Sequence, residues 1–234
     1  MNKSDTQPNI PLIIAVKIEN RTEHFRNSWV KLPITKDFFH EEVSVICDSW
    51  DDLIIDSYYT TIPCFFVAQL METPLSLVNH LAARLQTLDS EQILKLFMLQ
   101  EKSTDFDAIE QIIDYTYQLD KYELIQGVTS YRELGNLRKS ELDVNSIPPY
   151  FARCIHTIPF GIEAMLHENG CFTPLGYISR KDGCKKKAKK RYIPACLDIK
   201  GKDGEEIVGN KDFSHIFEHP CIDEDEEMEV GVYL

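Results

Sequence analysis

Residues 74–99 read PLSLVNHLAARLQTLDSEQILKLFML and contain the clearest helical pattern in the chain. Thr73 and Pro74 favour a helix start, because a threonine oxygen accepts backbone N–H groups and proline needs no partner at the first helical position. Apolar residues then recur at every third or fourth position, which places them on one helix face. This face comprises Leu75, Val78, Leu81, Ala82, Leu85 and Leu88, and we expect Asn79, Arg84 and Gln86 to lie off it.

A second helix restarts at Asp89 or Ser90. Its apolar positions occupy more than one face of the helix, which is typical of a helix buried between neighbouring elements. These positions are Ile93, Leu94, Leu96, Phe97 and Leu99. Residues 74–99 therefore predict an apolar helical hairpin in the core, and this pattern alone indicates no function.

The segment before the hairpin predicts a small α+β unit. Residues 11–18 are β-branched and mostly apolar, as in a central strand, and residues 28–33 continue in an extended alternation. Thr35 caps a short helical segment. Apolar runs follow at residues 43–47 and 52–56.

The segment after the hairpin alternates between helices and extended stretches. A third helix opens at Thr104 and has two faces. Phe106, Ile109 and Ile113 are expected inside, and Asp107, Glu110 and Asp114 outside. Ser130 and Glu133 form a capping box that starts a helix at Tyr131. Residues 160–170 predict a helix closed by Gly170, and residues 171–179 an extended segment.

These patterns predict an α+β fold of three small domains with a charged C-terminal extension. The expected parts are a polar arm (1–9), an α+β domain (10–69), a helical middle domain (70–126), a mixed α+β domain (127–180) and a partly disordered extension (181–234). The extension contains a basic run at residues 185–191 and an acidic run at residues 223–227, and runs of like charge are usually solvated.

The chain is strongly acidic, with 38 Asp and Glu against 25 Lys and Arg, a net charge of −13. Residues 1–180 hold 25 acidic and 15 basic residues, so the excess is not confined to the tail. Such a charge repels nucleic acids and membranes and favours basic partners.

The seven cysteines have no spacing typical of a disulfide scaffold. The chain opens with a polar sequence, without the pattern of a signal peptide or a membrane-spanning run. We therefore expect a cytoplasmic protein with reduced thiols.

Four short motifs, in this order and at these distances, resemble the ArdA antirestriction family over residues 10–180. They are Trp29-Val-Lys-Leu-Pro33; Asn79-His-Leu-Ala82 with Arg84, Leu85 and Leu88; Gly127-Val-Thr with Glu133-Leu-Gly135; and Gly170-Cys-Phe-Thr173 with Gly176-Tyr-Ile178.

The resemblance implies an elongated, non-catalytic DNA mimic without a cofactor, carried by a phage or another mobile element in a bacterial host. Such a protein occupies the DNA-binding groove of a type I restriction-modification enzyme, binding its methyltransferase core, and tends to form homodimers through the third domain. DNA carries one negative charge about every 1.7 Å of its axis. A protein that mimics DNA must therefore present carboxylates where DNA has phosphates. The candidates are Asp48, Asp51, Asp52, Asp56, Asp105, Asp107, Glu110, Asp114, Asp120 and Glu123.

Two features depart from this pattern and keep a second function open. The third domain contains Arg132, Arg138, Lys139 and Arg153, which dilute its acidity, and the extension with its basic run has no counterpart in the family. The alternative is an adaptor or regulatory protein of a mobile element, with the same fold and another protein partner.

Metal sites are further alternatives. Asp48, Asp51, Asp52 and Asp56 with His24 or His40 offer ligands for Mg²⁺, as in a metal-dependent hydrolase. Cys184, Cys196, His215, His219 and Cys221 offer zinc ligands at irregular spacing. The interpretation we favour has neither site, because no catalytic motif accompanies the carboxylates.

Overall fold

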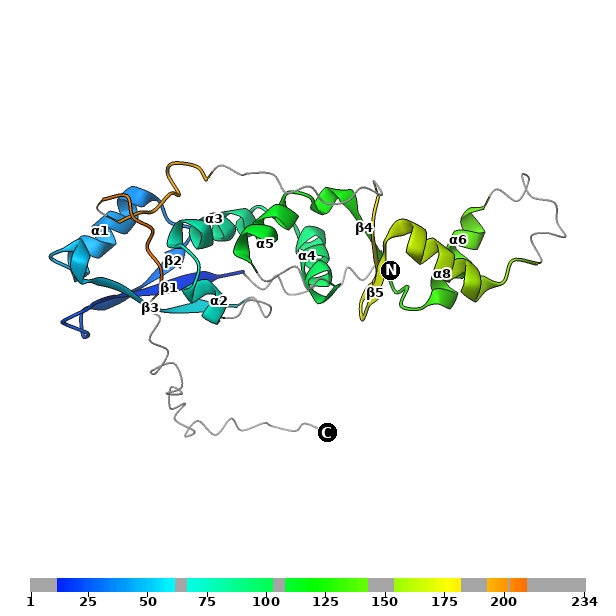
Figure 1. The fold of residues 1–234 in the computed structure, drawn as a ribbon, viewed down its shortest axis with the longest axis horizontal. Helices are drawn as coiled ribbons and strands as arrows, with labels where there is room; N and C mark the ends of the chain where they lie inside the picture. Colours follow the sequence, from blue (N-terminus) through cyan, green and yellow to red (C-terminus); the bar gives the residue numbers. More distant parts are fainter. Residues whose placement is uncertain are drawn as a thin grey trace, which may run out of the picture.

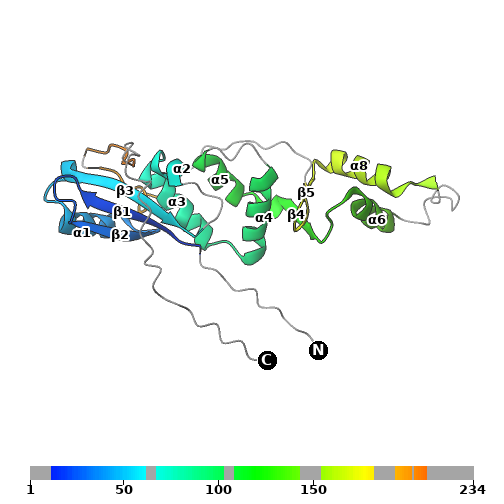
Figure 2. The same ribbon diagram turned by 90° about the horizontal axis from the view of Figure 1, so that it is seen from below.

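The fold is an elongated assembly of two small antiparallel sheets and the helices around them. It is given by a computed structural model that describes residues 12–61, 67–102, 108–142, 154–181, 193–201 and 203–209. One sheet and helix α1 lie at one end, helices α3 to α5 in the middle, and α6 and α8 at the other end (Figures 1 and 2). The predicted mixed α+β class is confirmed.

The first sheet has the strand order β2-β1-β3, from Asn27–Leu32, Ile14–Asn20 and Leu53–Thr60. Alternate residues of β1 (Ile14, Val16 and Ile18) are buried on one face. On the other face Lys17 lies between Trp29 of β2 and Ser57 of β3. The apolar runs at residues 11–18, 28–33 and 52–56 therefore contribute strands, and one sheet face is covered.

Helix α1 spans Lys36–Ile46 and packs on this sheet through Phe39, Val43 and Ile46. The Thr35 side chain accepts from the Phe38 N–H, which confirms the predicted cap. The run 43–47, which the sequence separated from the helix, supplies its last turn. This happens because Val43 and Ile46 continue the buried stripe at helical spacing.

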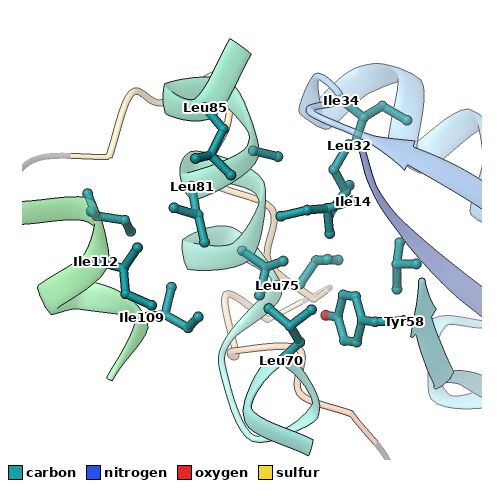
Figure 3. Packing of buried hydrophobic residues seen from close by; sticks show 14 of the residues in the cluster. Ile14, Leu32, Ile34, Tyr58, Leu70, Leu75, Leu81, Leu85, Ile109 and Ile112 are labelled. Carbon is teal, nitrogen blue, oxygen red and sulfur yellow. The ribbon is translucent and has the colours of Figure 1, made fainter. Parts of the chain in front are cut away.

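Helix α3 (Leu75–Gln86) lies between the first sheet and helix α5 (Ile109–Thr116). Figure 3 shows Leu75, Leu81 and Leu85 of α3 between Ile14 on the sheet side and Ile112 on the α5 side. The predicted apolar face is confirmed for these residues and for Val78 and Ala82, whereas Leu88 is partly exposed.

Two expectations about α3 are wrong. Thr73 does not cap the helix: Pro74 occupies the cap position without a side-chain hydrogen bond. The Thr73 hydroxyl donates instead to the Gln69 carbonyl. Asn79 was placed off the buried face but is fully buried, because its side chain binds the backbone N–H and C=O of Ile34, both at 2.8 Å.

The rest of the middle region contains α2 (Val67–Met71) and α4 (Ser90–Lys102), followed by the 3-10 turn η2 (Leu119–Lys121). Asp89 accepts from the Gln92 N–H, so Asp89 is the residue that caps α4. The third helix begins at Ile109 in the part that the structure describes, and Phe106 lies outside that part.

The second sheet has the order β4-β6-β5, from Tyr122–Gln126, Gly176–Arg180 and Cys171–Thr173. The stretch 171–179 was expected as one extended segment but forms a hairpin. Strand β4, which no pattern indicated, pairs antiparallel with β6 from Gln126 opposite Gly176 to Tyr122 opposite Arg180.

Helices α6 (Tyr131–Glu141) and α8 (Thr157–Glu168) pack closely against each other. Ser130 accepts from the Glu133 N–H, which confirms the predicted cap of α6. A Cβ atom on Gly135 would collide with the Thr157 carbonyl, so glycine permits this approach. At the end of α8, Asn169 rather than Gly170 adopts the left-handed conformation (φ 49°).

A return segment, residues 193–201 and 203–209, lies beside α1, α3 and the first sheet (orange in Figure 1). Its carbonyls accept the first N–H groups of two helices, Lys36 to Cys196 (2.9 Å) and Leu75 to Ile207 (2.8 Å). Ile199 is fully buried in the core. Part of the predicted extension is therefore integral to the N-terminal end, while the runs 185–191 and 223–227 lie outside the described residues.

Candidate interaction surface

Three of the predicted carboxylates, Asp48, Asp51 and Asp52, lie together where the chain leaves α1 and enters β3. Asp51 and Asp52 belong to the 3-10 turn η1 (Trp50–Asp52), which the Ser49 hydroxyl caps by accepting from the Asp51 N–H. The Asp48 side chain is 88% exposed and lies 3.4 Å from a guanidinium nitrogen of Arg26. Local capping thus holds this group of carboxylates at one end of the molecule.

Asp56 differs from Asp48, which also lies near a cation, because its ion pair is shorter and its side chain is only 38% exposed. Its carboxylate accepts from Lys17 Nζ at 2.9 Å across the open face of the first sheet, and Glu19 lies 3.4 Å from the same nitrogen. Burial acts to lower the pKa of Lys17, but the hydrogen bonds and charges of the two carboxylates raise it above its ordinary value. Asp56 therefore contributes little free negative charge.

Helix α1 adds carboxylates that the predicted set omitted. Asp37 and Glu41 are exposed on the side of α1 away from the sheet, and Glu42 is partly exposed. Residues 36–56 contain seven carboxylates and one lysine. The signal was available in the sequence, because Asp37 and Glu41 are four residues apart and off the stripe of Phe39 and Val43.

The return segment brings further carboxylates to the same end of the molecule. Asp203, Glu205 and Glu206 are exposed, and the Ser76 hydroxyl of α3 donates to Glu206 (3.2 Å). No local sequence pattern could indicate this placement, because more than 120 residues separate Glu206 from Ser76.

The carboxylates predicted for the middle region differ from one another in their exposure and in their partners. Glu110 is exposed at the first turn of α5, and Asp120 is exposed and accepts from the Gln92 side chain at 3.1 Å. Glu123 on β4 is exposed and lies 4.0 Å from Arg138. Asp105 and Asp107 lie outside the described residues.

Asp114 is a wrong prediction. It is only 7% exposed, although it follows Glu110 at helical spacing and was placed on the outer face. Neighbouring Ile113 and Tyr115 are also buried, because α5 is covered on nearly all sides. A carboxylate with so little exposed surface offers little charge to a docking partner, so we leave Asp114 out of the proposed binding surface.

Arg138 was expected to dilute the acidity of the third domain, but it is used inside that domain. Its guanidinium donates to Glu168 (2.9 and 3.0 Å) and to Glu141 (2.9 and 3.1 Å). Hydrogen bonds to Glu168 chiefly raise the pKa of Arg138, against the effect of burial. Its positive charge is therefore matched locally.

The proposed metal sites find no support in the part of the chain described here, where no three His, Cys, Asp or Glu side chains gather as metal ligands. His24 contacts Glu19, and His40 packs edge-on against Trp50. Cys196 is exposed, and the other proposed zinc ligands (Cys184, His215, His219 and Cys221) lie outside the described residues.

None of the helices among the described residues has the length and apolar character needed to cross a membrane. No protein-family model matches the sequence, and no curated protein matches it.

Proposed function

We propose that this protein is a non-catalytic antirestriction protein of the ArdA type. It mimics DNA and occupies the DNA-binding groove of a type I restriction-modification enzyme, in the cytoplasm of a bacterial host. The three-domain organisation of that family, with boundaries near residues 69, 126 and 180, is part of the proposal.

The observation that carries the proposal is the excess of exposed carboxylates on an elongated body. They begin at α1 and η1 and continue along the molecule to Glu110 and Asp120. A groove that grips DNA is lined with Lys and Arg, and its binding free energy comes largely from releasing counterions. An acidic rod offers these cations carboxylates in place of phosphates while presenting no phosphodiester bond to cleave.

The decisive experiment measures binding of the full chain to a purified type I methyltransferase core across a salt series, with duplex DNA as competitor. We expect affinity to fall steeply as salt rises, and DNA to displace the protein. Failure to bind several such enzymes at low salt would overturn the proposal.

A matched pair of variants tests the carboxylates themselves. Replacing Glu41, Asp48 and Asp51 by their amides should weaken binding about tenfold at low salt and make the salt dependence shallower. Asp56→Asn is the control, because Lys17 already neutralises this carboxylate. Equal losses in the two variants would show that local charge at η1 does not determine binding.

We also propose that the protein is a homodimer formed through its third domain. Helix α8 exposes Ile158, Ile162 and Leu166, which recur at every fourth position and therefore form one apolar strip. Light scattering should give twice the chain mass for the native protein and the single mass for Ile162→Glu/Leu166→Glu. Leu175→Glu, an exposed leucine in the β5–β6 turn, should remain dimeric.

A mobile-element adaptor is the second candidate, and the weak charge of the third domain favours it. Residues 127–181 hold six basic and five acidic residues, unlike a rod that is acidic from end to end. Under this alternative, the full chain captures a different basic protein and ignores methyltransferase cores at every salt concentration.

A further inference from the structure

Helix α1 carries exposed apolar side chains among its exposed carboxylates. Phe38 is 53% and Val45 74% exposed, although both belong to a regular helix. They are seven residues apart and so lie on the same side of α1, with Glu41 and Glu42 between them. We call Asp37, Phe38, Glu41 and Val45 the α1 surface.

Packing within the fold does not account for these two apolar residues. Helix α1 already contacts the sheet through Phe39, Val43 and Ile46, on another side of the helix. At the C-terminal end of the α1 surface, the Arg26 guanidinium donates to the Val45 carbonyl (3.1 Å). Phe25, next to Arg26 in the chain, is 83% exposed. Exposed apolar groups among polar residues are typical of binding surfaces.

We propose that Phe38 and Val45 are apolar anchors by which the α1 surface docks into the DNA-binding groove of the methyltransferase core. This inference rests on the proposed function. The groove matches the charge of residues 36–56, which contain seven carboxylates and one lysine. We expect that groove to offer apolar contacts as well, because proteins that read the major groove contact thymine methyl groups with apolar side chains.

The two kinds of contact differ in their response to salt. Carboxylates set against lysines and arginines contribute a term that weakens as ionic strength rises. Burial of Phe38 and Val45 contributes a term that salt does not weaken. Central apolar anchors within a polar rim commonly dominate the binding free energy of an interface. Phe38 and Val45 should therefore preserve binding at high salt, where contacts between charges alone are too weak.

The experiment measures Kd of the full chain for a purified type I methyltransferase core between low and high salt. Phe38→Ser should weaken binding about tenfold, and Val45→Ser about threefold, by the same factor at every salt concentration. The Glu41→Gln/Asp48→Asn variant should instead reduce the slope of log Kd against log salt. Two independent anchor variants guard against an effect of one substitution on folding.

Trp29→Ser is the matched control, because Trp29 is 52% exposed on the open face of the first sheet. It should bind like the native protein. The inference is overturned if both anchor variants bind within twofold of the native chain, or if Trp29→Ser loses as much. If the native chain itself binds no core, the proposed function fails, and this inference fails with it; loss of the anchor effect alone leaves the proposed function intact.

Discussion

The two ends of the molecule have opposite surface chemistry although each is built from a small antiparallel sheet and helices. Residues 36–56 at one end contain seven carboxylates and one lysine, whereas residues 127–181 at the other are nearly balanced. The acidic end exposes charge around α1 and η1, and the balanced end exposes the apolar strip of α8. This difference matches the division of labour that we propose, with partner binding at one end and self-association at the other.

The two ends also differ in the sequence separation of the segments that form them. The acidic end depends on the return segment, which arrives from residues 193–209 and closes the first turns of α1 and α3. The balanced end is completed locally, by the pairing of β4 with β6 and by the close contact of α6 with α8. Substitutions at the two ends should therefore have separable effects.

Ile199→Asp should have the largest effect. It places a charge at a fully buried position of the N-terminal core, which costs about 3–5 kcal/mol. We expect a large fall in the thermal midpoint, with loss of hydrogen-exchange protection in β1, α1 and α3 before α6 and α8. Val208→Asp is the control, since Val208 lies in the same segment and is 42% exposed. Equal effects would contradict the structural role of Ile199.

Gly135→Ala should have an intermediate effect, confined to the opposite end. The added methyl group meets the Thr157 carbonyl, so α6 and α8 must separate at a cost of about 1–3 kcal/mol. Hydrogen exchange should increase in these two helices and not in the first sheet. Asn136→Ala, at the exposed neighbouring position, should leave both ends unchanged.

Glu133→Gln should have the smallest effect on stability. We expect it to change how the thermal midpoint depends on pH. The Thr129 N–H and the Ser130 and Thr129 side chains lower the pKa of Glu133 below its ordinary value. Its charged form therefore stabilises the start of α6 above the unfolded-state pKa, and this contribution disappears as pH falls through the folded-state pKa. The midpoints of native and variant chains should differ at pH 7 and converge in acid. A constant difference would assign the effect to another cause.

Local sequence patterns predicted the elements whose signals lie within a few residues. The caps at Thr35 and Ser130 and the apolar face of α3 are of this kind, because capping and helical periodicity are short-range properties. The carboxylates at η1 and on α5 were also found by sequence, but charge alone did not distinguish exposed Glu110 from buried Asp114.

Long-range contacts account for the failed placement of Asn79 and for the ion pair of Asp56. Asn79 looked like a surface residue, yet the Ile34 backbone makes it a buried one. Asp56 looked like a phosphate analogue until Lys17, from another strand, was placed beside it. In each case a partner distant in the chain determined burial or charge.

The sequence by itself determined the mixed α+β class, the two helices within residues 74–102 and the acidic balance, since composition and periodicity carry this information without any partner. Only the tertiary structure decided which carboxylates remain exposed and that the return segment closes α1 and α3. The physical reason is that burial and ion pairing depend on contacts between segments. Those contacts are set by the packing of the whole chain, and no local pattern encodes them.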